Sequence, residues 1–127
     1  MVIKRGDIFY ADLNPSFGSE QGGIRPVLVV QNNIGNIHSP TIVVLPITSM
    51  KKRPLPVHTR VDDTDLLTDG SIVLAEQIRT IDKRRLKEKM GSVDDASMSK
   101  VNEAISISFG IFLYCMRYVR NTISDFC

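Results

Sequence analysis

The sequence predicts a mainly β domain: a small, strongly curved antiparallel barrel or half-barrel of six short strands, followed by one C-terminal helix. From position 8 to position 93, short runs rich in apolar and β-branched residues alternate with turn residues. No long crossover segment separates one run from the next. After position 94 the apolar residues change to helical spacing. At 127 residues the chain can form one domain with its own core.

The six strands follow from these runs in chain order. The first, Ile8 to Leu13, is closed by the turn-forming sequence Asn14-Pro15-Ser16. The others are Val27 to Gln31, Thr41 to Ile47, Val57 to Val61, Ser71 to Ile78 and Leu86 to Val93. Asp82 can cap a brief helical turn before the last strand. The residues between the second and third strands, rich in asparagine, are expected to form an irregular connection.

The C-terminal helix begins at a start signature, Ser92-Val93-Asp94-Asp95. The residues expected on its apolar face are Met98, Val101, Ile105, Phe109, Phe112 and Met116, so the helix is predicted to run nearly to the C-terminus. Its most apolar part, Ala104 to Met116, is too short to span a bilayer. We therefore expect a buried helix and no membrane partner.

Charge and cysteine content limit the possible classes. A net charge of +2 does not by itself mark a strong nucleic-acid binder, and the basic clusters support a polyanionic partner only weakly. Cys115 and Cys127, the only cysteines, form neither a disulfide framework nor a metal-ligand spacing, which suits a reducing compartment. The N-terminus has no apolar signal core. We expect a cytoplasmic protein without a metal site.

The segment Gly18 to Pro26 is the strongest functional signal. Three glycines among positions 18 to 23 let the backbone take positive φ and allow a ligand to approach closely. The segment carries a hydroxyl, a carboxylate and an amide, and it ends in Arg25, which Pro26 biases towards extended geometry just before a rigid strand. A surface loop whose arginine makes a salt bridge explains this stretch equally well.

Three stretches, Gly6 to Leu13, Gly18 to Pro26 and Leu74 to Arg79, closely resemble the MazF/PemK toxins of bacterial toxin–antitoxin systems, especially the Gram-positive members. The resemblance extends from Met1 to about Ile111. It implies an SH3-like barrel that forms a homodimer and cuts single-stranded RNA, such as mRNA, at a short sequence without a metal ion or other cofactor. It also implies inhibition by a MazE-like antitoxin that binds across the dimer.

We expect residues 1–127 to form a single domain that resembles these toxins. Residues 113–127, Leu113 to Cys127, look longer than the usual C-terminus of the family. They form a C-terminal extension to which neither the residues nor the resemblance assigns a role.

RNA can be cut without a cofactor because its 2′-hydroxyl lies next to its own phosphorus. The protein must align this hydroxyl, take its proton, stabilise the phosphorane and protonate the 5′-oxygen. Arg25 is a natural stabiliser because its planar fork can hold two phosphate oxygens. Thr48 offers a hydroxyl at the end of the third strand. The family's catalytic arginine and threonine match these two residues. Glu20 is the leading candidate for the general base, although it can equally be a solvated loop charge.

Further residues are candidates for RNA binding by stacking, by reading base edges or by contacting phosphates. They are Phe17, Ser19, Gln21, Lys51, Lys52, Arg53, Leu55, His58, Glu76 and Gln77. Phe17 can stack on a base and Leu55 can act as an apolar wedge, but partial burial explains both equally well. Glu76 and Gln77 are expected on a strand with their side chains outward, and His58 is not expected to be catalytic.

Two other classes fit the same fold. The expected barrel resembles that of gyrase-poisoning toxins, which bind a protein target and do no chemistry. The combination of Arg25, Thr48 and the glycine-rich segment argues against this class. An SH3-like peptide-binding module needs a groove lined by aromatic side chains, which a chain with no Trp, three Tyr and five Phe supplies poorly.

Overall fold

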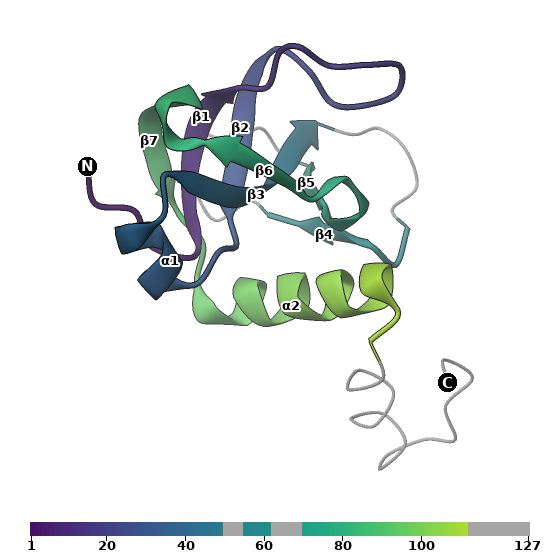
Figure 1. The fold of residues 1–127 in the computed structure, drawn as a ribbon. Coiled ribbons are helices and arrows are strands. Elements are labelled where there is room, and N and C mark those ends of the chain that lie inside the picture. The colour runs from purple at the N-terminus through teal and green to yellow at the C-terminus, as the bar shows by residue number, and fades with distance from the viewer. Residues whose placement is uncertain (50–54, 62–69, 112–127) are drawn as a thin grey trace, which may run out of the picture.

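The computed structural model describes residues 1–49, 55–61 and 70–111. Within them the chain forms seven strands, two α-helices and two short 3₁₀ turns (Figure 1). The strands are β1 (Asp7–Asp12), β2 (Ile24–Val29), β3 (Thr41–Ser49), β4 (His58–Arg60), β5 (Ser71–Leu74), β6 (Arg79–Asp82) and β7 (Leu86–Ser92). The helices are α1 (Asn33–His38) and α2 (Asp95–Phe109), and the 3₁₀ turns are η1 (Ala75–Gln77) and η2 (Lys83–Arg85).

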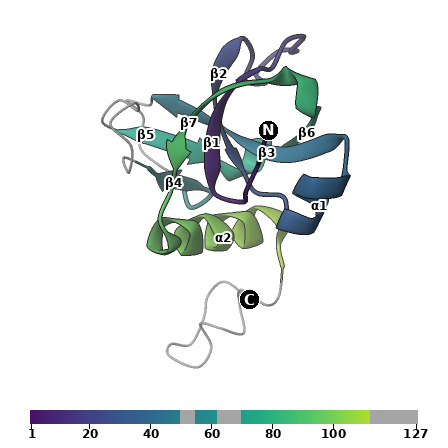
Figure 2. The ribbon, with the colours of Figure 1, turned by 90° about the vertical axis from the view of Figure 1, so that its left-hand side faces the viewer.

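The strands form one antiparallel sheet with β3 at its centre. The order is β4-β5-β3-β2-β1-β7, and β6 pairs with β3 outside this order. The two ends of β3 have different partners on the same edge: Thr41 to Val44 pair with β6, and Ile47 to Ser49 pair with β5. The sheet curls strongly, as two views at right angles show (Figures 1 and 2). The predicted mainly β domain with a C-terminal helix is therefore confirmed.

Buried side chains lie on both faces of the sheet, which explains why the central strands are apolar almost without interruption. In β1 and β2, Ile8 and Leu28 belong to one core cluster, whereas their neighbours Phe9 and Val27 belong to the other. The first cluster also contains Met98 and other residues of α2, which lies across one end of the curled sheet in both ribbon views. Successive residues point to opposite faces of a strand, so each strand supplies both cores.

The predicted fifth strand, Ser71 to Ile78, is wrong in its second half. A continuous ladder from β5 would place Glu76 opposite Val44, but Arg79 is paired there, three residues later. The extra residues form η1, so Glu76 and Gln77 lie on a turn and not on a strand. Pro46, which has no N–H to donate, lies in β3 between the two paired segments, where the ladder is interrupted.

Two predicted boundaries also differ from the structure. The expected connection after β2 contains helix α1, where the side chain of Asn32 caps the helix by accepting the N–H of Gly35 at 2.8 Å. Helix α2 ends at Phe109 because Gly110 takes φ +66°, and the N–H of Ile111 then donates to the carbonyl of Ser106 at 3.0 Å. The remainder of the predicted helix lies outside the described residues.

The end of α2 is also less buried than the sequence suggests. Phe109 is 55% exposed and Ile111 is 42% exposed, although Ala104 to Met116 was expected to be a buried helix. Within the part of the chain that the structure describes, no helix is both long and apolar enough to cross a membrane.

The first turn of α2 gives a prediction about stability. The Asp94 side chain accepts the N–H of Ser97 at 2.7 Å, and this hydrogen bond lowers the pKa of the Asp94 carboxyl. Asp94→Ala should lower the thermal midpoint, whereas Asp94→Asn should retain most of it because asparagine also caps helices. Because the folded pKa is lowered, the stabilisation is present at neutral pH and is lost as the pH falls through that lowered pKa.

The measurement is thermal unfolding followed by circular dichroism at pH 7 and again below about pH 4. The difference between the wild-type protein and Asp94→Ala should shrink in acid. An equal difference at both pH values would show that the carboxylate charge does not contribute to the cap.

Candidate functional site

An open pocket of about 530 Å³ lies between the glycine-rich segment and η1. Its lining residues are Pro15, Ser19, Glu20, Gln21, Pro46, Glu76, Gln77, Ile78 and Arg79. Five of these were predicted as functional residues, and they come from two segments more than 50 residues apart in the sequence. A volume of this size is within the ordinary range for small-ligand pockets.

The glycine-rich loop, defined here as residues 16–23, is closed on itself at its tip. The N–H of Phe17 donates to Oε1 of Glu20 at 2.5 Å, and the N–H of Glu20 donates to the carbonyl of Phe17 at 3.1 Å. Gly18 and Gly23 have φ of +57° and +76°, which residues with a Cβ rarely adopt. The tight turn leaves the Phe17 ring 86% exposed, so it is available to stack on a ligand.

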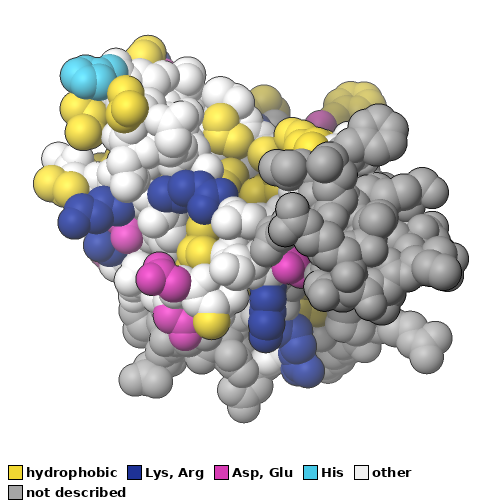
Figure 3. Space-filling view, turned by 90° about the horizontal axis from the view of Figure 1, so that it is seen from below, with side chains coloured by type: hydrophobic (Ala, Val, Ile, Leu, Met, Phe, Trp, Pro, Cys, Tyr) yellow, Lys and Arg dark blue, Asp and Glu magenta, His cyan; other side chains and the backbone are white. Residues whose placement is uncertain are grey.

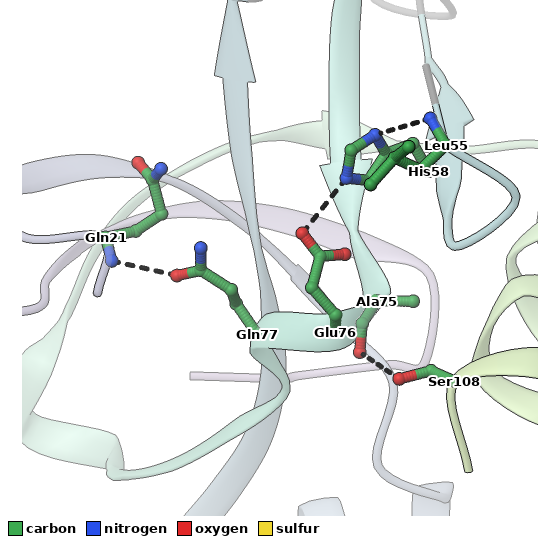
Figure 4. A network of polar contacts seen from close by, with 7 residues as sticks. All are labelled: Gln21, Leu55, His58, Ala75, Glu76, Gln77 and Ser108. Carbon is green, nitrogen blue, oxygen red and sulfur yellow. Dashed lines mark hydrogen bonds and ion pairs between the residues drawn. The ribbon is translucent and has the colours of Figure 1, made fainter. Parts of the chain in front are cut away.

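The turn η1 connects this loop to two other elements (Figure 4). The N–H of Gln21 donates to Oε1 of Gln77 at 2.9 Å, across the pocket. Oε1 of Glu76 lies 3.0 Å from Nε2 of His58. On the other side, Oγ of Ser108 in α2 donates to the carbonyl of Ala75 at 3.5 Å. These contacts fix the position of Glu76 and Gln77 relative to the loop.

His58 orients Glu76. Its side chain is only 5% exposed, and its Nδ1 accepts the N–H of Leu55 at 3.0 Å. A ring nitrogen that accepts a hydrogen bond carries no proton, so the neutral ring has its proton on Nε2 and donates it to Glu76. Both ring nitrogens are therefore engaged, which favours an orienting role for His58 over proton transfer.

Arg25 lies near the start of β2 and Thr48 near the end of β3, the neighbouring strand. The pairing of β2 with β3 ends with Val27 opposite Pro46. The same register extended by two residues would set Arg25 opposite Thr48, on the same face of the sheet as Pro46. Nε of Arg25 donates to the carbonyl of Gly22 at 2.8 Å. This bond ties the end of the loop to β2 and engages only one of the five N–H groups of the guanidinium.

Arg25 and Thr48 do not themselves line the 530 Å³ pocket. They lie next to it, because Pro46, which does line it, precedes Thr48 by two residues in β3. The arrangement thus has two parts: an arginine and a hydroxyl at the strand ends, and an adjoining pocket whose lining is polar on the side of the loop and η1.

Arg79 was not among the residues predicted to bind a ligand. This residue begins β6, lines the pocket, and donates from Nη1 to the carbonyl of Leu13 at 2.7 Å. It ends the stretch Leu74 to Arg79, so its proximity to Glu76 and Gln77 was the available signal, but only those two residues were predicted to contact a ligand. The pocket lining also contains the carboxylates of Glu20 and Glu76.

The remaining predicted residues are only partly placed. Leu55 is exposed, consistent with either a wedge or simple partial burial. Lys51, Lys52 and Arg53 lie outside the described residues. Among residues 1–49, 55–61 and 70–111, no group of three or more His, Cys, Asp or Glu side chains could hold a metal ion.

Comparison with known proteins agrees with this geometry. Residues 4–109 match the model of a family described as PemK-like, MazF-like toxin of type II toxin–antitoxin system. The chain is 51% identical to endoribonuclease EndoA of Bacillus subtilis over 113 residues, which cover 87% of this chain and 97% of that protein. It is 48% identical to endoribonuclease MazF of Staphylococcus saprophyticus over 112 residues, which cover 87% and 93%.

Solved structures show the same fold. A mycobacterial endoribonuclease in complex with its cognate antitoxin matches with a TM-score of 0.73 at 30% identity, covering 86% of this chain and 96% of that one. MazF from Deinococcus radiodurans matches with a TM-score of 0.75 at 25% identity, covering 87% and 99%. Both matches cover nearly the whole of the solved chains.

Proposed function

Because this chain belongs to the family of PemK-like, MazF-like toxins of type II toxin–antitoxin systems, we propose that it cuts single-stranded RNA by attack of the 2′-hydroxyl, without a metal ion. It is a MazF-type toxin endoribonuclease. The observation that carries the proposed mechanism is the pairing of β2 with β3 up to Val27 and Pro46, whose extension by two residues supports a position of Arg25 near Thr48, beside a pocket lined by the glycine-rich loop and η1. None of the relatives named above is a gyrase-binding toxin.

In the proposed reaction the 2′-oxygen forms a bond to the adjacent phosphorus while the bond from phosphorus to the 5′-oxygen breaks. The departing 5′-oxygen takes up a proton from solvent, so that the products are a 2′,3′-cyclic phosphate and a 5′-hydroxyl. The N–H groups of Arg25 other than Nε–H stabilise the charge that develops on the phosphoryl oxygens, because a planar guanidinium can donate to two of them at once. The Thr48 hydroxyl donates to the same group from the opposite strand.

Glu20 is the proposed general base, which removes the proton from the 2′-hydroxyl. One carboxylate oxygen already accepts the N–H of Phe17 at 2.5 Å, and the other can accept a proton at the edge of the pocket. The same bond also closes the loop, so a substitution of Glu20 would affect loop shape as well as proton transfer.

The pocket and its surroundings are suited to bases of single-stranded RNA. The exposed Phe17 ring can stack on an unpaired base, while Glu76, Gln77 and Gln21 offer acceptors and donors for its edge. Ser19 can donate to phosphate or sugar from the loop, and Leu55 can separate neighbouring bases. Lys51 to Arg53 would contact phosphates and make binding salt-dependent.

We further propose a homodimer that is inhibited by an antitoxin and acts in the cytoplasm. The mycobacterial relative was solved with its cognate antitoxin, which supports the same kind of partner here. Large apolar side chains are exposed at Met1, Val2, Ile34 and Ile37, and Figure 3 shows hydrophobic side chains gathered around the α1 end of the molecule. Such a surface favours association with another protein chain.

The test is to incubate the purified protein with a long single-stranded RNA in excess EDTA and to separate the products on a denaturing gel. Discrete fragments are expected, along with no cleavage of the matching single-stranded DNA. If the RNA stays intact in EDTA and is cleaved once a divalent metal is added in excess, the metal-free mechanism is rejected. Intact RNA under all conditions would reject the enzyme and revive the binding-only alternatives.

A further inference from the structure

Arg79 is the one cationic side chain in the pocket lining, as far as the described residues define it. Two carboxylates, Glu20 and Glu76, line the same pocket. Arg79 begins β6 opposite Val44, next to a core cluster that includes Val29, Val44 and Ile81. A half-buried guanidinium at the edge of an aliphatic core loses hydration, so its position calls for an explanation.

A purely structural role accounts for only part of this position. Arg79 donates one N–H to the carbonyl of Leu13 at 2.7 Å. However, the same end of β1 is already held by Arg85, whose Nη1 donates to the carbonyls of Asp12, at 3.0 Å, and Asn14. Arg85 does not line the pocket. The two arginines therefore hold the same segment, but only Arg79 also faces the ligand space.

The chemistry of the lining divides into two kinds. Amides and carboxylates, as in Gln21, Gln77 and Glu76, match the donors and acceptors on the edge of a base. The two carboxylates do not match a phosphate, because like charges in the same pocket repel each other. A guanidinium is suited to a phosphate because it can donate two parallel hydrogen bonds to its oxygens.

We propose that Arg79 binds an RNA phosphate, namely that of the nucleotide whose base occupies the 530 Å³ pocket. This phosphate is distinct from the scissile one, which is assigned to Arg25. The inference rests on the proposed RNA-cutting function and adds a phosphate-binding residue to the same site. The bond to Leu13 would hold the guanidinium in place for this contact, and the remaining N–H groups would make it.

The test compares Arg79→Gln, Arg79→Lys and the matched control Arg85→Gln. The probe is an RNA oligonucleotide that contains a cut site mapped with the wild-type protein, with a 2′-deoxy nucleotide at that site to prevent cleavage. Affinity is measured by fluorescence anisotropy over a series of salt concentrations. Thermal unfolding of each variant identifies any loss of folded protein.

Arg79→Gln should bind about tenfold more weakly near physiological salt, because it loses a charge-assisted hydrogen bond. Its slope of log affinity against log salt should fall by about 0.7, the value for one phosphate of a single strand. Arg79→Lys should keep the slope and lose affinity, since an ammonium retains the charge but not the fork. Arg85→Gln should keep both the affinity and the slope.

An unchanged slope in Arg79→Gln, or an equal loss in Arg85→Gln, would overturn the inference in favour of a structural tie. If Arg79→Gln does not fold, Arg79→Lys decides: wild-type affinity in that variant would overturn the inference. If the wild-type protein neither binds nor cuts RNA, the proposed function itself fails. If it does both while Arg79→Gln keeps the wild-type slope, only the role of Arg79 is rejected.

Discussion

Arg25→Lys should lower the single-turnover rate of RNA cleavage about a hundredfold, equivalent to a loss of roughly 3 kcal/mol of transition-state stabilisation. Lysine keeps the positive charge but replaces a rigid two-pronged donor with a single ammonium. The affinity for uncut RNA should change much less, because the ground state needs only charge at this position.

The measurement is single-turnover cleavage of a labelled RNA, with affinity taken separately on a 2′-deoxy analogue of the cut site. Arg84→Lys is the matched control, because Arg84 is an exposed arginine paired with Asp82 and does not line the pocket. The control should cleave at the wild-type rate. If Arg25→Lys also does so, or loses only affinity, Arg25 anchors a phosphate and the catalytic roles fall to Thr48 and Glu20.

A single 2′-deoxy nucleotide on the 5′ side of the scissile phosphate should abolish cleavage at that position. The substitution removes the nucleophile itself, so no arrangement of Arg25, Thr48 and Glu20 can compensate for it. Binding should change little, since one hydroxyl is removed from a long contact surface. In the control RNA the deoxy nucleotide lies one position further in the 3′ direction, so that the attacking 2′-hydroxyl is retained. This RNA should still be cut at the original site. Cleavage of the first substrate would require an attacking water in place of the 2′-hydroxyl.

The central strands could be predicted because both of their faces are buried. Ile8 and Phe9, or Val27 and Leu28, enter different cores, and this produces the uninterrupted apolar runs that mark β1 and β2. The N-terminus of α2 was equally accessible, since Asp94 caps the helix through a local contact with Ser97. These features depend on neighbouring residues, which a sequence displays directly.

Features that depend on distant pairing were missed. The division of residues 71–82 into β5, η1 and β6 depends on how two segments align along β3 around Pro46, which the apolar pattern does not reveal. Helix α2 was extended too far because apolar spacing continues past Gly110, although a glycine after a helical run was a local stop signal.

Most residues of the candidate site were predicted, but the turn η1, which carries Glu76 and Gln77, was not. The resemblance to a known family named both the glycine-rich loop and the stretch Leu74 to Arg79, and the structure brings them together through the Gln21–Gln77 hydrogen bond. Their roles in RNA cleavage remain proposals. Arg79 was missed because its contact with the Leu13 carbonyl joins residues 66 positions apart.

The chemistry of the product ends tests the central claim most directly. An RNA oligonucleotide cut in the presence of EDTA can be analysed by mass spectrometry before and after treatment with acid, which opens cyclic phosphates. We predict a 2′,3′-cyclic phosphate on the upstream fragment and a 5′-hydroxyl on the downstream fragment, because the 2′-oxygen displaces the 5′-oxygen directly. A 5′-phosphate with a free 3′-hydroxyl would show that water attacked the phosphorus and would contradict the roles assigned to Arg25, Thr48 and Glu20.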